Sequence, residues 1–303
     1  MIKEEGDFTH FYDDPKNKTL VLYRMKDKTP RRTEVPYPTE FPYAVAQFKN
    51  DLYFTGGGRS TETNDELFLK TAVKVKVNPK DMDAIPENLI EMTIARTKHS
   101  MIVVNGAFIY VVGGLNSNGI IASCEEYQID KSTWKKSASL NEQRMRISLI
   151  TIEPRYIYAF GGEVDKKPNG SKTIEYLDTS DKEAKLWTKV TLTSGASDWP
   201  EIRLPGTFQI STNDIMIFGG YVGKTEISTT FIFNIPSKTM KKNGDLAQKD
   251  VFLMTRPVVD GNDLTVLGKN DGHRYNLLDK KWSLLRKETL TPIAGFFVKA
   301  DTV

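Results

Sequence analysis

Short apolar runs that end in glycine recur along the chain. The clearest covers residues 108–112 and ends in Gly113-Gly114. Comparable runs occupy 52–55, 157–160 and 215–218, and a weaker copy at 264–267 precedes Gly268-Lys269. Each run is too short for a helix and is rich in β-branched and aromatic residues, which predicts a buried strand. The copies recur about every 50 residues, a spacing typical of propeller blades.

Further strand patterns surround each run, so each repeat predicts four antiparallel strands. In the clearest repeat we expect strands at 101–104, 108–112, 125–129 and 134–136, with a hairpin turn at Asn105-Gly106. The predicted blades occupy 41–94, 95–143, 144–201, 202–249 and 250–290. Residues 1–40 supply three strand patterns and 291–303 supply one. Together these ends predict a sixth blade, which would make residues 1–303 a single closed all-β domain.

Composition and charge restrict the possible partners and the cellular compartment. The chain has 42 basic and 39 acidic residues, a net charge of +3, and its charges are well mixed. This balance favours neither a nucleic-acid nor a membrane surface. The single cysteine, Cys124, excludes an intrachain disulfide and favours a reducing compartment, so we expect a cytoplasmic protein. We find no signal peptide pattern and no apolar stretch of about 18 residues.

The repeats resemble kelch repeats. The resemblance depends on the apolar run ending in Gly-Gly, followed by an aromatic residue and then a tryptophan. The glycine pairs are Gly56-Gly57, Gly113-Gly114, Gly161-Gly162 and Gly219-Gly220, and the aromatic pairs are Tyr127 with Trp134, Tyr176 with Trp187 and Tyr275 with Trp282. The resemblance covers residues 41–290 and implies a six-bladed kelch β-propeller. Phe233 has no following tryptophan, the 41–94 repeat lacks the pair, and Lys269 replaces a second glycine.

The glycines and paired tryptophans are interpreted as structural. Glycine lets the chain turn closely against a neighbour, and a flat indole fills the space between blades. A phosphate-binding role for Gly56-Gly57-Gly58 would require a following helix, whereas a strand pattern follows. Trp199 fits no strand pattern, so we treat it as a candidate exposed anchor for a partner.

Catalytic patterns are absent. His10, His99 and His273 are far apart and have no metal-ligand spacing, and no nucleophile motif occurs. Glu125 and Glu126 are adjacent on a strand and therefore point to opposite faces. We expect no enzyme activity, metal or cofactor.

Polar loops give a clearer functional prediction. Two loops emerge on the same side of each blade: the one leading into the innermost strand and the one leaving the second strand. Together they form a polar surface with an excess of basic residues, which we call the loop face. The candidate partner-binding residues are Arg59, Lys98, His99, Arg146, Lys166, Trp199, Arg203, Tyr221 and His273. Resemblance to BTB-kelch adaptors implies that Arg146, and more loosely Lys98, holds a target peptide. Arg96, Arg144 and Arg203 match a recurring arginine two residues earlier, which would tie blades together; loop arginines also commonly serve only as solvated charges.

These features predict a non-catalytic protein-interaction scaffold of a eukaryotic cell. Its partner would be a protein or peptide, and converging arginines favour an acidic one. The resemblance implies a substrate receptor of a ubiquitin ligase or a cytoskeletal tether, although the sequence contains no BTB-like helical segment, so a ligase role would need another chain. The alternatives are a kelch-type enzyme acting on a sugar or small metabolite and a permanent subunit of a large complex. The oligomeric state is not predicted.

Overall fold

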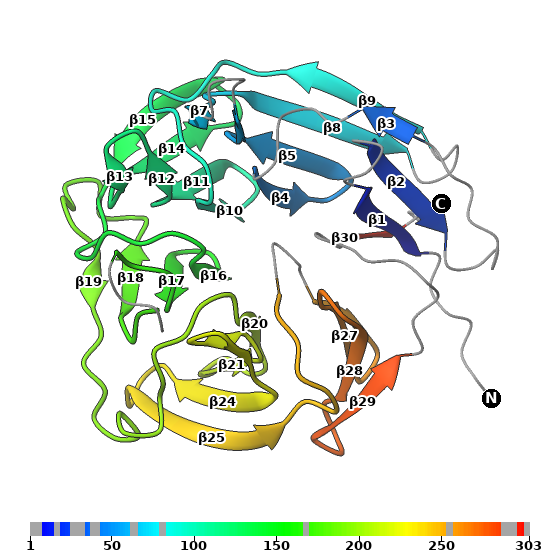
Figure 1. Cartoon of the computed structure of the whole chain (residues 1–303), viewed down its shortest axis with the longest axis vertical. Coiled ribbons are helices and arrows are strands. Elements are labelled where there is room, and N and C mark those ends of the chain that lie inside the picture. Colours follow the sequence, from blue (N-terminus) through cyan, green and yellow to red (C-terminus); the bar gives the residue numbers. More distant parts are fainter. Residues whose placement is uncertain are drawn as a thin grey trace.

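The computed structural model of the chain describes residues 8–14, 19–24, 34–36, 43–60, 66–78, 83–165, 170–252, 257–285 and 296–299. Within these ranges the regular elements are β-strands, and no helix is present. The strands form four-stranded antiparallel sheets arranged as propeller blades around a centre (Figure 1). The all-β propeller prediction is therefore confirmed.

Five blades are each made from one continuous stretch of chain, and in each blade the strands pair in chain order from the innermost outward. The first blade contains β4 (Ala44–Phe48), β5 (Asp51–Thr55), β8 (Ala72–Asn78) and β9 (Asp83–Asn88). The second contains β10 (Ser100–Val104), β11 (Phe108–Val112), β14 (Cys124–Gln128) and β15 (Thr133–Ser137). The third contains β16 (Ser148–Ile152), β17 (Tyr156–Phe160), β18 (Ile174–Asp178) and β19 (Thr188–Lys189). The fourth contains β20 (Gly206–Gln209), β21 (Asp214–Phe218), β24 (Thr229–Asn234) and β25 (Thr239–Asp245). The fifth contains β26 (Val258–Asp260), β27 (Asp263–Leu267), β28 (Gly272–Asn276) and β29 (Lys281–Leu285).

These five blades are one fewer than the six that the sequence predicts. The two ends of the chain form a further four-stranded sheet from β1 (Phe8–Asp14), β2 (Thr19–Arg24), β3 (Glu34–Pro36) and β30 (Phe296–Lys299). Its strand order is β3-β2-β1-β30, and β1 pairs with β30 antiparallel.

Three short hairpins between the second and third strands were not predicted. They are β6 (Gly58–Ser60) with β7 (Glu66–Phe68), β12 (Leu115–Asn116) with β13 (Gly119–Ile120), and β22 (Tyr221–Val222) with β23 (Thr225–Glu226). The hairpin predicted at Asn105-Gly106 is present, and both residues have positive φ, 50° and 59°.

The core lies in layers between neighbouring blades. The innermost strands β4, β10, β16 and β20 follow one another around the centre (Figure 1). One apolar cluster joins the first and second blades, and others join the second to the third, the third to the fourth and the fourth to the fifth. An inner strand is therefore buried on both faces, which explains why the repeated runs are continuously apolar.

The glycine pairs lie where adjacent blades meet. Gly113 has φ 62°, and a Cβ there would lie 2.2 Å from the carbonyl oxygen of Arg144 in the next blade. The amide of Gly114 donates to the same oxygen at 2.9 Å. Equivalent backbone hydrogen bonds run from Gly57 to Arg96, Gly162 to Ile202 and Gly220 to Asp250. Only a residue without Cβ permits this approach.

The tryptophans differ in their placement. Tyr127 packs on Trp134, with ring centroids 4.9 Å apart, and Tyr275 packs on Trp282 at 5.0 Å. The third predicted pair is wrong, because Tyr176 is opposite Thr188 rather than Trp187. Leu177 takes the position of Tyr127, since it opposes Ile157 as Tyr127 opposes Ile109. Trp187 is nevertheless buried, and its indole donates to the carbonyl oxygen of Ala138 in the second blade at 3.0 Å.

Candidate functional site

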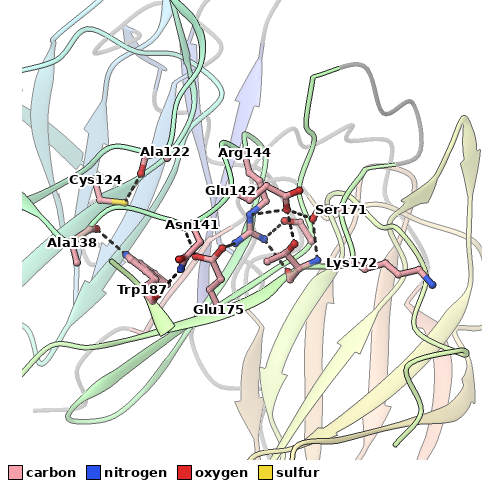
Figure 2. Close-up of polar contacts among 12 residues, drawn as sticks. Ala122, Cys124, Ala138, Asn141, Glu142, Arg144, Ser171, Lys172, Glu175 and Trp187 are labelled. Carbon is pink, nitrogen blue, oxygen red and sulfur yellow. Dashed lines mark hydrogen bonds and ion pairs between the residues drawn. The ribbon is translucent and has the colours of Figure 1, made fainter. Parts of the chain in front are cut away.

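Arg96 and Arg144 are buried behind the loop face. The Arg96 guanidinium donates to the carbonyl oxygens of Gly113 and Ser123 at 2.8 and 2.7 Å, and it pairs with Glu125 at 2.8 Å. Arg144 likewise donates to the carbonyl oxygens of Gly161 and Thr173, but it lies further from its carboxylates, at 3.5 Å from Glu175 and 3.9 Å from Glu142 (Figure 2). Burial lowers the pKa of both arginines, although their carboxylate partners act in the opposite direction. Each arginine side chain thus anchors the segment that enters its own blade, whereas the contact with the preceding blade is the backbone hydrogen bond from Gly57 to Arg96 or from Gly114 to Arg144.

Arg203 does not belong to this set. Ile202 is the residue whose carbonyl oxygen accepts the hydrogen bond from Gly162, so it takes the position of Arg96 and Arg144. Arg203 is one residue further on and bridges to Tyr221, as Met145 bridges to Glu163. The shift of one residue turns the Arg203 side chain out of the core and onto the loop face.

Three of the candidate binding residues are buried, so predicting them as contact residues was wrong. Trp199 is 1% exposed and donates its indole hydrogen to the carbonyl oxygen of Lys172 at 2.9 Å. His99 is buried and contacts the Thr55 hydroxyl at 2.8 Å. His273 is buried and contacts Asp250 at 2.9 Å. Large or polar side chains in these loops pack inward because the blades meet there.

The remaining candidates divide by what the structure describes. Lys98, Arg146, Arg203 and Tyr221 are partly exposed on the loop face. Arg59 lies in β6, where only the backbone is described, and Lys166 lies outside the described residues. Lys98 and Arg146 occupy equivalent positions with φ near 52°, and the Arg146 amide donates to the Lys98 carbonyl oxygen at 2.8 Å.

Charged side chains connect three neighbouring blades across the loop face. We call this set the charged ladder; its members are Arg146, Glu163, Arg203, Tyr221, Glu226 and Lys269. Arg146 and Arg203 both contact Oε2 of Glu163, at 2.9 and 3.3 Å. Arg203 also lies over the Tyr221 ring, with its guanidinium carbon 5.1 Å from the centroid.

The ladder continues into the fifth blade through Glu226. The Tyr221 hydroxyl donates to Oε1 of Glu226 at 3.0 Å, and the Lys269 ammonium contacts the same oxygen at 3.1 Å. The Asn270 amide donates to Oε2 at 3.0 Å. Partial burial opposes ionisation of Glu226, but the hydrogen bonds from Lys269 and Tyr221 outweigh it and lower its pKa. The same hydrogen bond to Glu226, with one to Tyr221, raises the pKa of Lys269, so both groups are charged at neutral pH.

The cationic side chains of the ladder remain partly accessible to solvent. Side chains in the ladder are 33% exposed at Arg146, 19% at Arg203 and 47% at Lys269. Three cations and two carboxylates make this surface net basic. Sequence reasoning missed Glu226, Lys269 and Asn270, although the replacement of a repeat glycine by Lys269 was the signal that could have found this contact.

Among the described residues, no group of three metal-ligating side chains occurs. The part of the chain that the structure describes has no helix able to span a membrane. Cys124 is fully buried, and burial raises the pKa of its thiol to about 11.

Comparison with known proteins agrees with this architecture. The sequence model of the Kelch motif matches residues 95–141, the second blade. Alpha-scruin of Limulus polyphemus is 22% identical over 219 residues, which is 70% of this chain and 22% of that protein. Beta-scruin of the same animal is 30% identical over 141 residues, which is 44% of this chain and 14% of the relative. Kelch-like protein 41a of Danio rerio is 26% identical over 128 residues, covering 42% of this chain and 20% of the relative. The chain thus spans about a fifth or less of each.

The fold likeness extends further than the sequence likeness. A solved structure described as that of YjhT superposes with a TM-score of 0.68 at 14% identity, covering 93% of this chain and 95% of the other. At this identity the likeness shows the fold alone. The architecture defines a β-propeller with four-stranded blades. The match to the Kelch motif in the second blade, together with the similarity to Kelch-like protein 41a and the scruins, supports a kelch-repeat propeller family for this chain.

Proposed function

We propose that this chain is a non-catalytic interaction module that holds a partner protein or peptide on the loop face. The charged ladder is the observation that carries the proposal, because it places Arg146, Arg203 and Lys269 on one surface across three blades. Intramolecular contacts hold these side chains in place before a partner arrives, which lowers the entropic cost of binding. The two buried histidines that could act as general bases are committed to contacts with Thr55 and Asp250.

The partner chemistry follows from the donors. Guanidinium groups bind carboxylate and phosphate groups through paired hydrogen bonds, so an acidic or phosphorylated segment suits Arg146 and Arg203. Such a partner would be a client that the propeller presents to a larger assembly, as in a ubiquitin ligase, or a cytoskeletal component. We place the protein in the cytoplasm, because its one cysteine is a buried thiol, and in a eukaryotic cell, because the relatives it resembles are animal proteins.

We also propose that residues 1–303 form one six-bladed ring, in which residues 1–40 and 291–303 make the closing blade. Pairing of β1 with β30 supports this, because it joins the two ends of the chain by strand hydrogen bonds. In Figure 1 this sheet occupies the sector between the first and fifth blades.

The test is partner capture from a eukaryotic lysate, with mass spectrometry, comparing the wild type with a Lys98→Ala/Arg146→Ala variant. Because the Arg146–Glu163 pair is partly exposed, its loss costs only about 0–1 kcal/mol and the variant stays folded. The control is Lys189→Ala/Lys241→Ala, which removes two exposed lysines from the outer strands β19 and β25. We expect the first variant to lose partners that the control retains. Equal recovery from both variants would place the binding surface elsewhere.

A further inference from the structure

A polar cleft lies beside the outer strands of two blades, and none of the loop-face candidate residues lines it. We call it the side cleft. It lies between the second and third blades and has a volume of about 710 Å³. One wall is the face of β11, β14 and β15 that carries Phe108, Tyr110, Glu126 and Lys135. The other wall is the β18–β19 connection, residues 179–187. This connection leaves its blade at the end opposite Gly161, since β18 runs away from the glycine pair.

The cleft has an identifiable cause in the sequence. At the junction of the third and fourth blades the equivalent positions are filled with aromatic rings: Tyr158 stacks on Tyr176 at 5.3 Å and contacts Phe233 at 5.9 Å. At the junction of the second and third blades, Glu126 stands in the position of Tyr176, and Leu177 stands in the position of Phe233. Smaller and charged side chains there leave space that the neighbouring junction does not have.

A longer loop covers this space. The outer connection of the third blade occupies 179–187, whereas those of the second, fourth and fifth blades occupy only 129–132, 235–238 and 277–280. Asp178 fixes the start of the loop, because it accepts hydrogen bonds from Arg155 at 2.7 Å and from the Ser180 hydroxyl at 2.7 Å. Ser139 fixes its end through backbone hydrogen bonds with Lys185 and Trp187, at 3.0 and 2.9 Å. The cleft is therefore bounded by ordered elements on both sides.

Charge in the cleft favours an anionic ligand. Four lysines line it: Lys135, Lys136, Lys182 and Lys185. The carboxylates of its wall are occupied within the protein. Glu126 accepts a hydrogen bond from the Tyr110 hydroxyl and lies 3.6 Å from the Lys182 ammonium, Asp178 binds Arg155, and Asp181 accepts the Glu183 amide at 3.1 Å.

Two ammonium groups remain for a ligand. Among the described residues, Lys135 and Lys185 form no ion pair. Lys136 opposes Glu125, so its side chain lies on the other face of β15. Apolar side chains of Phe108, Leu177 and Ala184 line the same space.

We propose that the side cleft binds a short acidic peptide segment of a partner protein, independently of the loop face. Lysines would bind its carboxylates, and the apolar part of the wall would take an aliphatic side chain between them. The volume falls within the range of about 300–1,000 Å³ typical of ligand pockets, and a half-open cleft of this size accommodates a few residues of extended chain.

The test measures fluorescence anisotropy of a fluorescein-labelled peptide of about eight residues, composed of glutamates with one central leucine. We expect saturable binding to the full chain that Lys135→Gln/Lys185→Gln weakens by roughly tenfold or more, equivalent to about 1.4 kcal/mol. The matched control is Lys241→Gln/Lys242→Gln, two exposed lysines on the outer strand β25 of another blade. The control should bind like the wild type, and so should Lys98→Ala/Arg146→Ala on the loop face.

A second variant separates cleft binding from general charge attraction. Glu126→Tyr introduces the residue found at the equivalent position of the third blade and fills the cleft, while it removes one negative charge. A peptide attracted only by surface charge would bind this variant more tightly, whereas a peptide inside the cleft loses binding. The proposal is overturned by equal weakening in both lysine pairs, by unchanged binding to Glu126→Tyr, or by no saturation up to about 1 mM peptide. Preferential binding of a labelled oligodeoxynucleotide that depends on the same lysines would also overturn the assignment to a peptide.

Discussion

The buried ion pair between Arg96 and Glu125 should behave as a coupled unit in folding. Its two side chains are 0% and 1% exposed and approach to 2.8 Å. Glu125 also accepts hydrogen bonds from the amides of Thr93 and Ile94 at 2.8 and 3.1 Å. Replacing Glu125 by leucine leaves the guanidinium buried without its counter-charge and leaves these amides without an acceptor. Removal of one partner from such a pair costs about 3–5 kcal/mol.

The double variant Arg96→Met/Glu125→Leu should cost less than the sum of the two single variants. Removing both charges avoids an isolated buried ion, and residues in direct contact typically show coupling of about 0.5–3 kcal/mol. Ile202 and Phe231 occupy the same pair of positions in the fourth blade, so this fold accepts an apolar pair there. We therefore expect coupling near the upper end of that range.

Urea unfolding of the wild type, both single variants and the double variant measures this coupling. The control pair is Arg155 and Asp178, which form a hydrogen-bonded salt bridge at the surface, where the arginine is 51% exposed. Arg155→Met should cost far less than Glu125→Leu, because solvent screens an exposed salt bridge. Additive effects of the Arg96 and Glu125 substitutions would refute the view that this pair stabilises the blade as a unit. So would a loss of stability in Glu125→Leu no larger than that in Arg155→Met.

Three further outcomes follow from burial and backbone geometry. Gly113→Ala should destabilise the protein by several kcal/mol in thermal unfolding, because its Cβ would meet the Arg144 carbonyl oxygen. In the control Gly261→Ala a Cβ meets nothing within 4 Å, so the loss of stability should be only the backbone strain of alanine at a positive φ. Burial, together with the charge of Arg96, lowers the pKa of His99 well below its ordinary value of 6.5, so the folded state binds fewer protons than the unfolded state. The free energy of unfolding should therefore fall as the pH drops below about 6.5. Urea unfolding between pH 5 and 7 should show a smaller fall for His99→Gln. Cys124 should react with a thiol reagent only as fast as the protein unfolds, and rapid reaction in the folded state would contradict its burial.

The sequence was sufficient for the blades because each inner strand is buried on both faces. Such strands must be continuously apolar, and their close packing requires glycine at the end, as at Gly113. Both requirements are local and leave a repeated pattern. The same reasoning could not separate buried from exposed polar side chains. His99 and Arg146 both occur near the start of an inner strand, yet His99 is buried whereas the Arg146 side chain remains 33% exposed.

Register explains the other errors. The sequence aligned Tyr176 with Tyr127, but strand pairing aligns Leu177 with Tyr127 and Tyr176 with Glu126. A shift of one residue exchanges the two faces of a strand, so this error concealed the difference that opens the side cleft. The contact between Lys269 and Glu226 could not be predicted from the sequence either, because Glu226 lies in a hairpin of the neighbouring blade that the sequence did not predict.

In each of four blades, the residue whose carbonyl oxygen accepts the hydrogen bond from the second glycine forms a buried side-chain pair within its own blade. These pairs show where variation is permitted in this fold. The positions hold Arg96 with Glu125, Arg144 with Glu175, Ile202 with Phe231 and Asp250 with His273. The chemistry changes from an ion pair to an apolar pair and then to a carboxylate–histidine hydrogen bond, while the backbone hydrogen bond from the second glycine is retained at 2.8–3.0 Å. Blade packing therefore depends on backbone geometry more than on any one side-chain pair. Because the blades accept this variation even in their core, surface positions where they differ, such as Lys269 and Glu126, can change without loss of the fold.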